Sequence, residues 1–152
     1  MSNQQDQDEL TVFHKFAKHF PSPIQIDSIR KCDASEPDIL CQLQNGTPLY
    51  FELVECIDER LARSIYGGFN EGGFFEDDLY VACIRDKFGK RYKTGAHRCD
   101  LLAYFDLQPI IPERSWRAGV EAFIEKHVKE TPFHKVWIYS VPQDKVISAI
   151  PL

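Results

Sequence analysis

Apolar residues recur along the chain with two different periods, which predict helices in some segments and strands in others. Over residues 6–20, leucine, phenylalanine and alanine side chains return at helical spacing, and Pro21 and Pro23 follow directly. We expect a helix there that packs by one face and is ended by the prolines. Residues 24–32 alternate moderately between apolar and polar, which predicts a first strand.

Two short apolar runs on either side of Asn45-Gly46 predict a hairpin, because Asn-Gly is the strongest short-range hairpin signal. A two-residue loop would pair Asp38 with Leu53 and would place Asp38 and Glu52 on opposite faces. A three-residue loop, with Gly46 in the left-handed region, would pair Asp38 directly with Glu52. Only the three-residue loop gathers the apolar side chains on one face, so we expect this register. Those side chains are Ile39, Cys41, Leu43, Leu49, Phe51 and Leu53.

The rest of the chain predicts helices alternating with buried strands. The expected elements are a helix over 76–92, a buried strand over 100–107, a helix over 112–130, and two strands over 136–141 and 146–150. The glycine-rich stretch 67–73 predicts a mobile lid or a surface loop. Together these elements indicate an α/β fold. We expect a mixed β-sheet with an αβββαβ core and helices on both faces, extended by a C-terminal helix and two strands.

Length and composition are those of an ordinary globular protein. The chain has 152 residues, of which 43% are hydrophobic and 12% aromatic, and this favours a single domain over residues 1–152. No apolar run approaches the roughly 18 residues that a membrane span needs. The polar, acidic start MSNQQDQDEL does not resemble a signal peptide. Five cysteines are scattered without a CxxC pair, as expected of free thiols in a cytoplasmic protein.

The paired acids of the hairpin are the first candidate for chemistry. Two carboxylates directly opposite each other repel, and a cation relieves this repulsion. Hard oxygen ligands suit Mg²⁺ or Mn²⁺, so Asp38 and Glu52 are candidate ligands of such an ion, with the Leu53 carbonyl as a third. The alternative is that both acids lie at strand ends in water, unpaired and without function.

The segment 85–98 carries six lysines or arginines against one acid, in a protein whose net charge is −5. Because the whole molecule is acidic, any contact with nucleic acid has to come from a local patch such as this one. The alternative is a solvated helix face followed by an exposed basic loop. The candidate phosphate-binding residues are Arg85, Lys87, Lys90, Arg91, Lys93 and Arg98.

The element order, with Pro37-Asp38 in one strand and Glu52 in the next, resembles the PD-(D/E)XK nuclease superfamily, which has the restriction-endonuclease-like fold. The resemblance covers about residues 9–107. It implies a nuclease in which Asp38 and Glu52 hold one or two divalent metal ions. Superfamily members often place an acid on the first helix, which would be Glu9 here; a plain N-terminal helix acid is the alternative.

The superfamily normally has a lysine two residues after the glutamate, beside the nucleophilic water, and this chain has Val54 there. Some members carry that lysine on the following helix, which implies Lys87 or Lys90 as the catalytic lysine. The segment 84–106 also resembles members with an I-x-x-K-x-x-K-x-Y helix before an LLxY strand.

Two functions are therefore expected. The first is a metal-dependent phosphodiester hydrolase that acts on DNA or RNA, and the paired acids and the basic segment favour it. The second is a catalytically silent protein of the same fold that serves as a binding or partner module and could form a homodimer. Val54 at the usual lysine position and the net negative charge favour the second.

Overall fold

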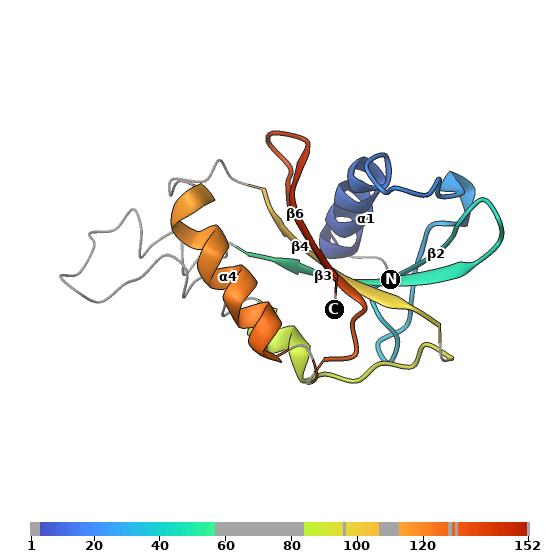
Figure 1. Ribbon diagram of the computed structural model, residues 1–152. Coiled ribbons are helices and arrows are strands. Elements are labelled where there is room, and N and C mark those ends of the chain that lie inside the picture. Colours follow the sequence, from blue (N-terminus) through green and yellow to red (C-terminus); the bar gives the residue numbers. More distant parts are fainter. Residues whose placement is uncertain are drawn as a thin grey trace.

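The computed structural model describes residues 4–56, 84–95, 97–106, 113–127, 129 and 131–151. The helices are α1 (Gln4–Ala17), the 3-10 helix η1 (Ile26–Ser28), a helical segment over 84–88, and α4 (Glu113–His127). The strands are β1 (Arg30–Lys31), β2 (Ile39–Gln42), β3 (Pro48–Glu55), β4 (Cys99–Phe105), β5 (Lys135–Ser140) and β6 (Lys145–Pro151). These elements form an α/β fold around a twisted central sheet (Figure 1).

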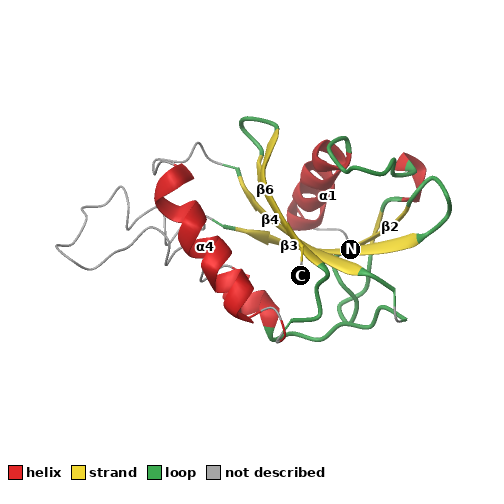
Figure 2. Cartoon of the chain, viewed as in Figure 1, coloured by secondary structure: helices red, strands yellow, loops and turns green. Residues whose placement is uncertain are grey.

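The six strands form one mixed sheet in the order β1-β2-β3-β4-β5-β6. The central strands β3, β4 and β5 run parallel, and the outer neighbours pair in antiparallel fashion. A parallel neighbour requires a crossover connection, and α4 follows β4 and precedes β5 in the chain. Figure 2 shows α4 as a long helix beside the strands. The mixed α/β sheet predicted from the sequence is confirmed.

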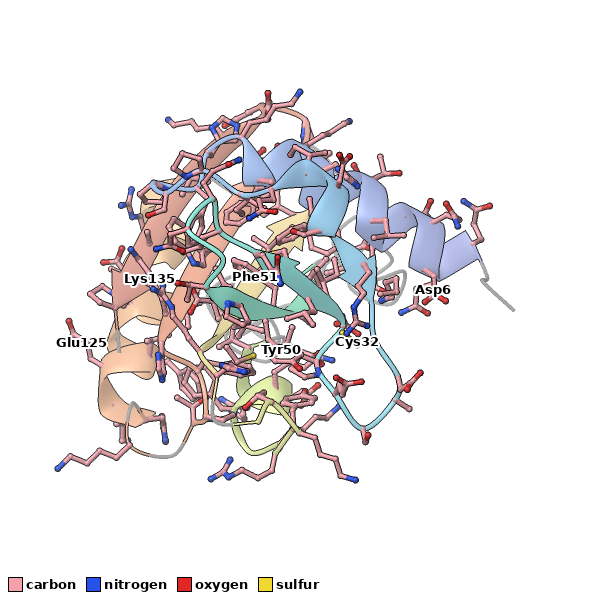
Figure 3. All side chains as sticks on the ribbon, turned by 90° about the vertical axis from the view of Figure 1, so that its right-hand side faces the viewer. Asp6, Cys32, Tyr50, Phe51, Glu125 and Lys135 are labelled. Atoms are coloured by element: carbon pink, nitrogen blue, oxygen red, sulfur yellow. The ribbon has the colours of Figure 1, made fainter. Side chains whose placement is uncertain are left out.

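Helices pack against both faces of the sheet, as predicted. On one face α1 packs against β3, and the ring centroids of Phe13 and Phe51 lie 4.8 Å apart. On the other face, Val120 of α4 and the segment 84–88 join Tyr50 in a second core. Because neighbouring strand residues point to opposite faces, Tyr50 and Phe51 belong to different cores (Figure 3). Strand β4 is buried along its whole length between the two cores, which explains its nearly continuous apolar sequence.

Two elements near the N-terminus differ from the prediction. Helix α1 ends at Ala17, before the prolines. The strand predicted over 24–32 is wrong for most of its length, since Ile24 makes only an isolated bridge and η1 separates it from β1. Polar side chains replace ladder hydrogen bonds in this stretch, as where Gln42 N–H donates to Ser28 Oγ at 2.8 Å.

The helix predicted over 76–92 is described from residue 84 onward and ends at residue 88, four residues early. Gly89 follows, and glycine is a poor helix former. Lys90 N–H then donates to Lys87 O at 3.2 Å, which closes a tighter final turn. Lys90 therefore lies on a loop and not on the helix.

The glycine-rich stretch 67–73 and Cys83 lie outside the described residues. The four cysteines that the structure does describe are free thiols, as expected from their spacing. They are Cys32, Cys41, Cys56 and Cys99. None of the described helices is long and apolar enough to cross a membrane.

Candidate functional site: a carboxylate pair between two lysines

The β2–β3 hairpin adopts the register that the sequence predicts. Ile39 pairs with Phe51, and Gly46 has a φ of 89°, in the left-handed region. One position further from the turn, this register sets Asp38 opposite Glu52. The predicted cross-strand pair is confirmed.

Each acid of the pair is tied to the backbone of the opposite strand. Asp38 N–H donates to Glu52 Oε1 at 3.0 Å, and Leu53 N–H donates to Asp38 Oδ2 at 2.9 Å. Glu52 is only 4% exposed, whereas the Asp38 side chain is 27% exposed. The two carboxylates are therefore held in fixed positions and are not loose in water at the strand ends.

The Leu53 carbonyl is directed toward the same edge of β3. Tyr50 N–H and Cys56 N–H both donate to backbone carbonyls on the β4 side, so even-numbered residues of β3 bond in that direction. The backbone groups of odd-numbered residues face β2, where Leu53 N–H meets Asp38. Because the N–H and C=O of one strand residue point to the same neighbour, the Leu53 oxygen also faces this side. It remains a candidate third ligand.

Lys87 supplies the ammonium group that Val54 cannot. Lys87 Nζ lies 2.8 Å from Glu52 Oε2, and its side chain is 19% exposed. Val54 points to the same face of β3 as Glu52 but packs against the apolar core there. Of the two predicted lysines, Lys87 reaches the acid pair, whereas Lys90 is exposed on the cleft wall.

Tyr92 donates a second hydrogen bond to the same oxygen as Lys87. Its hydroxyl lies 2.7 Å from Glu52 Oε2. Burial, and then this hydrogen bond, raise the pKa of Tyr92, so the hydroxyl keeps its proton and remains a donor. In the sequence, Tyr92 is only the last position of the I-x-x-K-x-x-K-x-Y pattern, and nothing there identifies it as a site residue.

Lys31 lies on the other side of Asp38. Its Nζ is 3.2 Å from Glu9 Oε1, 3.7 Å from Asp6 Oδ1 and 3.8 Å from Asp38 Oδ1. Glu9 of α1 is 6% exposed, so the first helix does bring an acid beside the pair, as the resemblance implies. Sequence reasoning missed Lys31, because the continuous strand expected over 24–32 gave no reason to turn this residue toward the acids.

The electrostatics of the pair are asymmetric. Burial, and then the charge of Glu52, raise the pKa of Asp38 to about 7. Burial also raises the pKa of Glu52, but the hydrogen bonds from Lys87 and Tyr92 outweigh it, and the net pKa is lowered. The pair therefore consists of one carboxylate held ionised by Lys87 and one carboxyl that keeps a proton up to near neutral pH.

The acids open into a cleft of about 830 Å³, within the size range of substrate sites. Its walls are the N-terminal turns of α1, the loop 33–36 and the loop 90–93. A backbone hydrogen bond from Lys93 N–H to Ser35 O, of 3.0 Å, joins the two loops. Asp6, labelled in Figure 3, marks the α1 side of the cleft.

The six candidate phosphate-binding residues do not form one surface. Lys90, Arg91 and Lys93 line the cleft beside the acid pair. Lys87 is bound to Glu52 and lines a neighbouring pocket, not this cleft. Arg85 lies on the α4 side of the molecule, where its guanidinium is 5.4 Å from the centroid of the Phe123 ring.

Arg98 forms an ion pair with Asp100 inside the protein. Its Nε and Nη2 atoms each lie 2.8 Å from a carboxylate oxygen of Asp100, which is completely buried. Trp137 Nε1 donates to the same carboxylate at 2.9 Å. The described contacts thus make Arg98 the counter-ion of a core acid, away from the cleft.

The donor chemistry of the pair suits a hard divalent ion. Within the described ranges, no group of three or more His, Cys, Asp or Glu side chains is arranged to hold a metal. The candidate donors are therefore two carboxylates and one backbone carbonyl, from Asp38, Glu52 and Leu53. Oxygen donors with an excess of negative charge suit Mg²⁺ or Mn²⁺, whose other positions are commonly filled by water and phosphate.

Neither a protein-family model nor a curated protein matches the sequence of this chain.

Proposed function

We propose that this chain is a divalent-metal-dependent phosphodiester hydrolase of the restriction-endonuclease-like type, which cleaves DNA or RNA. The observation that carries the proposal is the Asp38–Glu52 pair with Lys87 Nζ 2.8 Å from Glu52 Oε2. Hydrolysis of a phosphodiester needs charge stabilisation and an activated water next to the phosphorus. Lys87 also lies on the helix where some members of the PD-(D/E)XK superfamily carry their catalytic lysine, which supports the same assignment.

Each residue of the site would have a distinct role. Asp38, Glu52 and the Leu53 carbonyl would hold Mg²⁺ or Mn²⁺, which when bound lowers the pKa of a coordinated water and neutralises phosphate charge. Lys87 would orient the attacking water and stabilise the negative charge that develops on the phosphate oxygens. Tyr92 would act as a positioning residue, because its hydroxyl holds the Glu52 carboxylate in one orientation.

One wall of the cleft is positively charged, which supports binding of a polyanionic substrate along that wall. The loop 90–93 carries three cations, whereas Asp33 and Glu36 line the facing loop. A nucleic-acid strand is therefore expected to run along the loop 90–93, where the cations can contact its phosphates. Such contacts position a strand without reading its sequence.

A second candidate function is a catalytically silent binding or partner module of the same fold. Val54 stands where the superfamily normally has its lysine, and both oxygens of Glu52 already accept hydrogen bonds within the protein. The absence of a third metal-ligating side chain among the described residues favours this candidate as well.

A cleavage assay on mixed DNA and RNA, with Mg²⁺ or Mn²⁺ and with a chelator, separates the two candidates. Asp38→Asn removes a ligand charge while nearly keeping its shape, so cleavage should fall on the order of 100-fold while binding survives. Asp27→Asn, at an exposed position in η1, is the matched control and should cleave like the wild type. Unchanged cleavage by a folded Asp38→Asn protein contradicts the proposal, and a wild type without cleavage favours the binding module.

A further inference from the structure

Lys31 occupies a fixed position among the carboxylates of the cleft. It comes from the edge strand β1, and its Nζ contacts Glu9 at 3.2 Å and Asp38 at 3.8 Å. Its side chain is 20% exposed, so most of it is enclosed by the protein.

Lys31 Nζ also lies 3.7 Å from Asp6, so three carboxylates surround one cation, and carboxylates are the donors that a divalent ion uses. Glu9 and Asp38 come from different parts of the chain, and Lys31 Nζ contacts both of them. Asp38 also faces Glu52, so it stands between two possible cation positions. One lies toward Glu52 and Leu53, and the other is filled by the Lys31 ammonium group.

We propose that Lys31 takes the place of a second divalent ion, so that the cleft binds a single ion, between Asp38 and Glu52. The proposal rests on the function proposed above. In it, Lys31 is not a metal ligand but determines how many ions the cleft binds. A fixed positive charge beside Asp38 would repel a second ion at that position.

The number of bound Mn²⁺ ions tests the proposal without any measurement of cleavage. Calorimetric titration of the full chain should give one ion, and the electron paramagnetic resonance spectrum at saturation should be that of an isolated Mn²⁺. Lys31→Gln removes the charge but keeps an amide that can donate to Glu9, so it should bind two ions and give a spin-coupled spectrum. Lys15→Gln, at an exposed position of α1, is the matched control and should bind one ion.

Each outcome decides between the two proposals. If the wild type and Lys31→Gln each bind one ion, the proposed role of Lys31 is wrong and the proposed function still stands. The same holds if the wild type binds two ions. No ion in any of these proteins overturns both. No ion in the wild type but one in Lys31→Gln supports a resident ammonium group and overturns metal-dependent hydrolysis. If Lys31→Gln does not fold, the wild-type spectrum decides: an isolated ion supports the proposal, and a coupled pair overturns it.

Discussion

Asp38 is the residue whose ionisation we expect to lower the stability of the protein near neutral pH. Its pKa is raised from 3.8 to about 7, first by burial and then by the charge of Glu52. Between these values the folded chain binds a proton that the unfolded chain releases, so stability falls as the pH rises. The contribution of protonated Asp38 to the free energy of unfolding is complete below the pKa that Asp38 has in the unfolded chain. It is lost as the pH rises through about 7, the pKa of Asp38 in the folded chain.

Asp38→Asn should remove this pH dependence, because an amide does not ionise. The free energy of unfolding in urea, compared at about pH 5 and about pH 8, should fall less in the variant than in the wild type. The difference should be roughly 1–3 kcal/mol, since one pKa unit corresponds to about 1.4 kcal/mol. Asp27→Asn, exposed in η1, should keep the wild-type slope. Parallel slopes for the wild type and Asp38→Asn would contradict the raised pKa.

Lys87 and Lys90 allow a direct comparison between a lysine in the site and one on its wall. Lys87→Gln removes the ammonium group 2.8 Å from Glu52, so kcat should fall on the order of 100-fold. Lys90→Gln removes an exposed charge from the cleft wall and should raise KM more than it lowers kcat. Steady-state kinetics on one oligonucleotide distinguish the two effects, and equal losses of kcat would argue against Lys87 as the catalytic lysine.

At the scale of the elements, the hairpin turn sets the register on which the acid pair depends. Gly46 has a φ of 89°, and a Cβ added there would meet nothing within 4 Å. Gly46→Ala should therefore cost about 1–2 kcal/mol through its backbone conformation alone. Gly89→Ala is the matched control, because it also has open space and lacks a positive φ. Urea unfolding measures both, and equal stabilities would show that the turn is not strained by a side chain.

The Arg98–Asp100 pair lies at the start of β4, where Asp100 also accepts a hydrogen bond from Trp137 of β5. Arg98→Met would leave the completely buried Asp100 carboxylate with Trp137 as its remaining described side-chain donor. We expect a loss of about 2 kcal/mol, less than for a fully enclosed pair because the Arg98 side chain is 40% exposed. The variant should bind nucleic acid like the wild type under conditions where both are folded. Weaker binding at equal stability would place Arg98 at the interface instead.

For the whole molecule, a net charge of −5 makes the three cations of the loop 90–93 the main attraction for a nucleic acid. Replacement of both Lys90 and Arg91 by alanine should weaken binding. It should also reduce the slope of log Kd against log salt by roughly one per lost phosphate contact. Replacement of both Lys126 and Lys129 by alanine is the matched control, because these lysines are exposed near the end of α4. It changes the net charge by the same amount and should leave the slope unchanged. The same loss in both double variants would indicate that only net charge matters.

The elements with local signals could be predicted from the amino-acid sequence. Alternation and the Asn45-Gly46 turn predicted the hairpin, and the burial of apolar side chains on one face selected the register that pairs Asp38 with Glu52. Helical periodicity located α1 and α4, and the continuous apolar run located β4. Each of these signals arises from residues a few positions apart, whose spatial relation is set by the geometry of one helix, strand or turn.

Which charged side chains contact each other follows from the packing of the elements in three dimensions. Lys87 reaches Glu52 across 35 positions of sequence, and Lys31 reaches Glu9 across 22. Within the basic segment 85–98, Lys87 contacts Glu52 of the acid pair, whereas Arg98 forms an ion pair with the buried Asp100. The hydrophobic pattern fixes which face of an element is buried, but a long flexible side chain can reach several neighbours. The partner of such a side chain depends on how the elements pack and on which buried carboxylate lacks a counter-charge. Neither of these can be predicted from the spacing of residues along the chain.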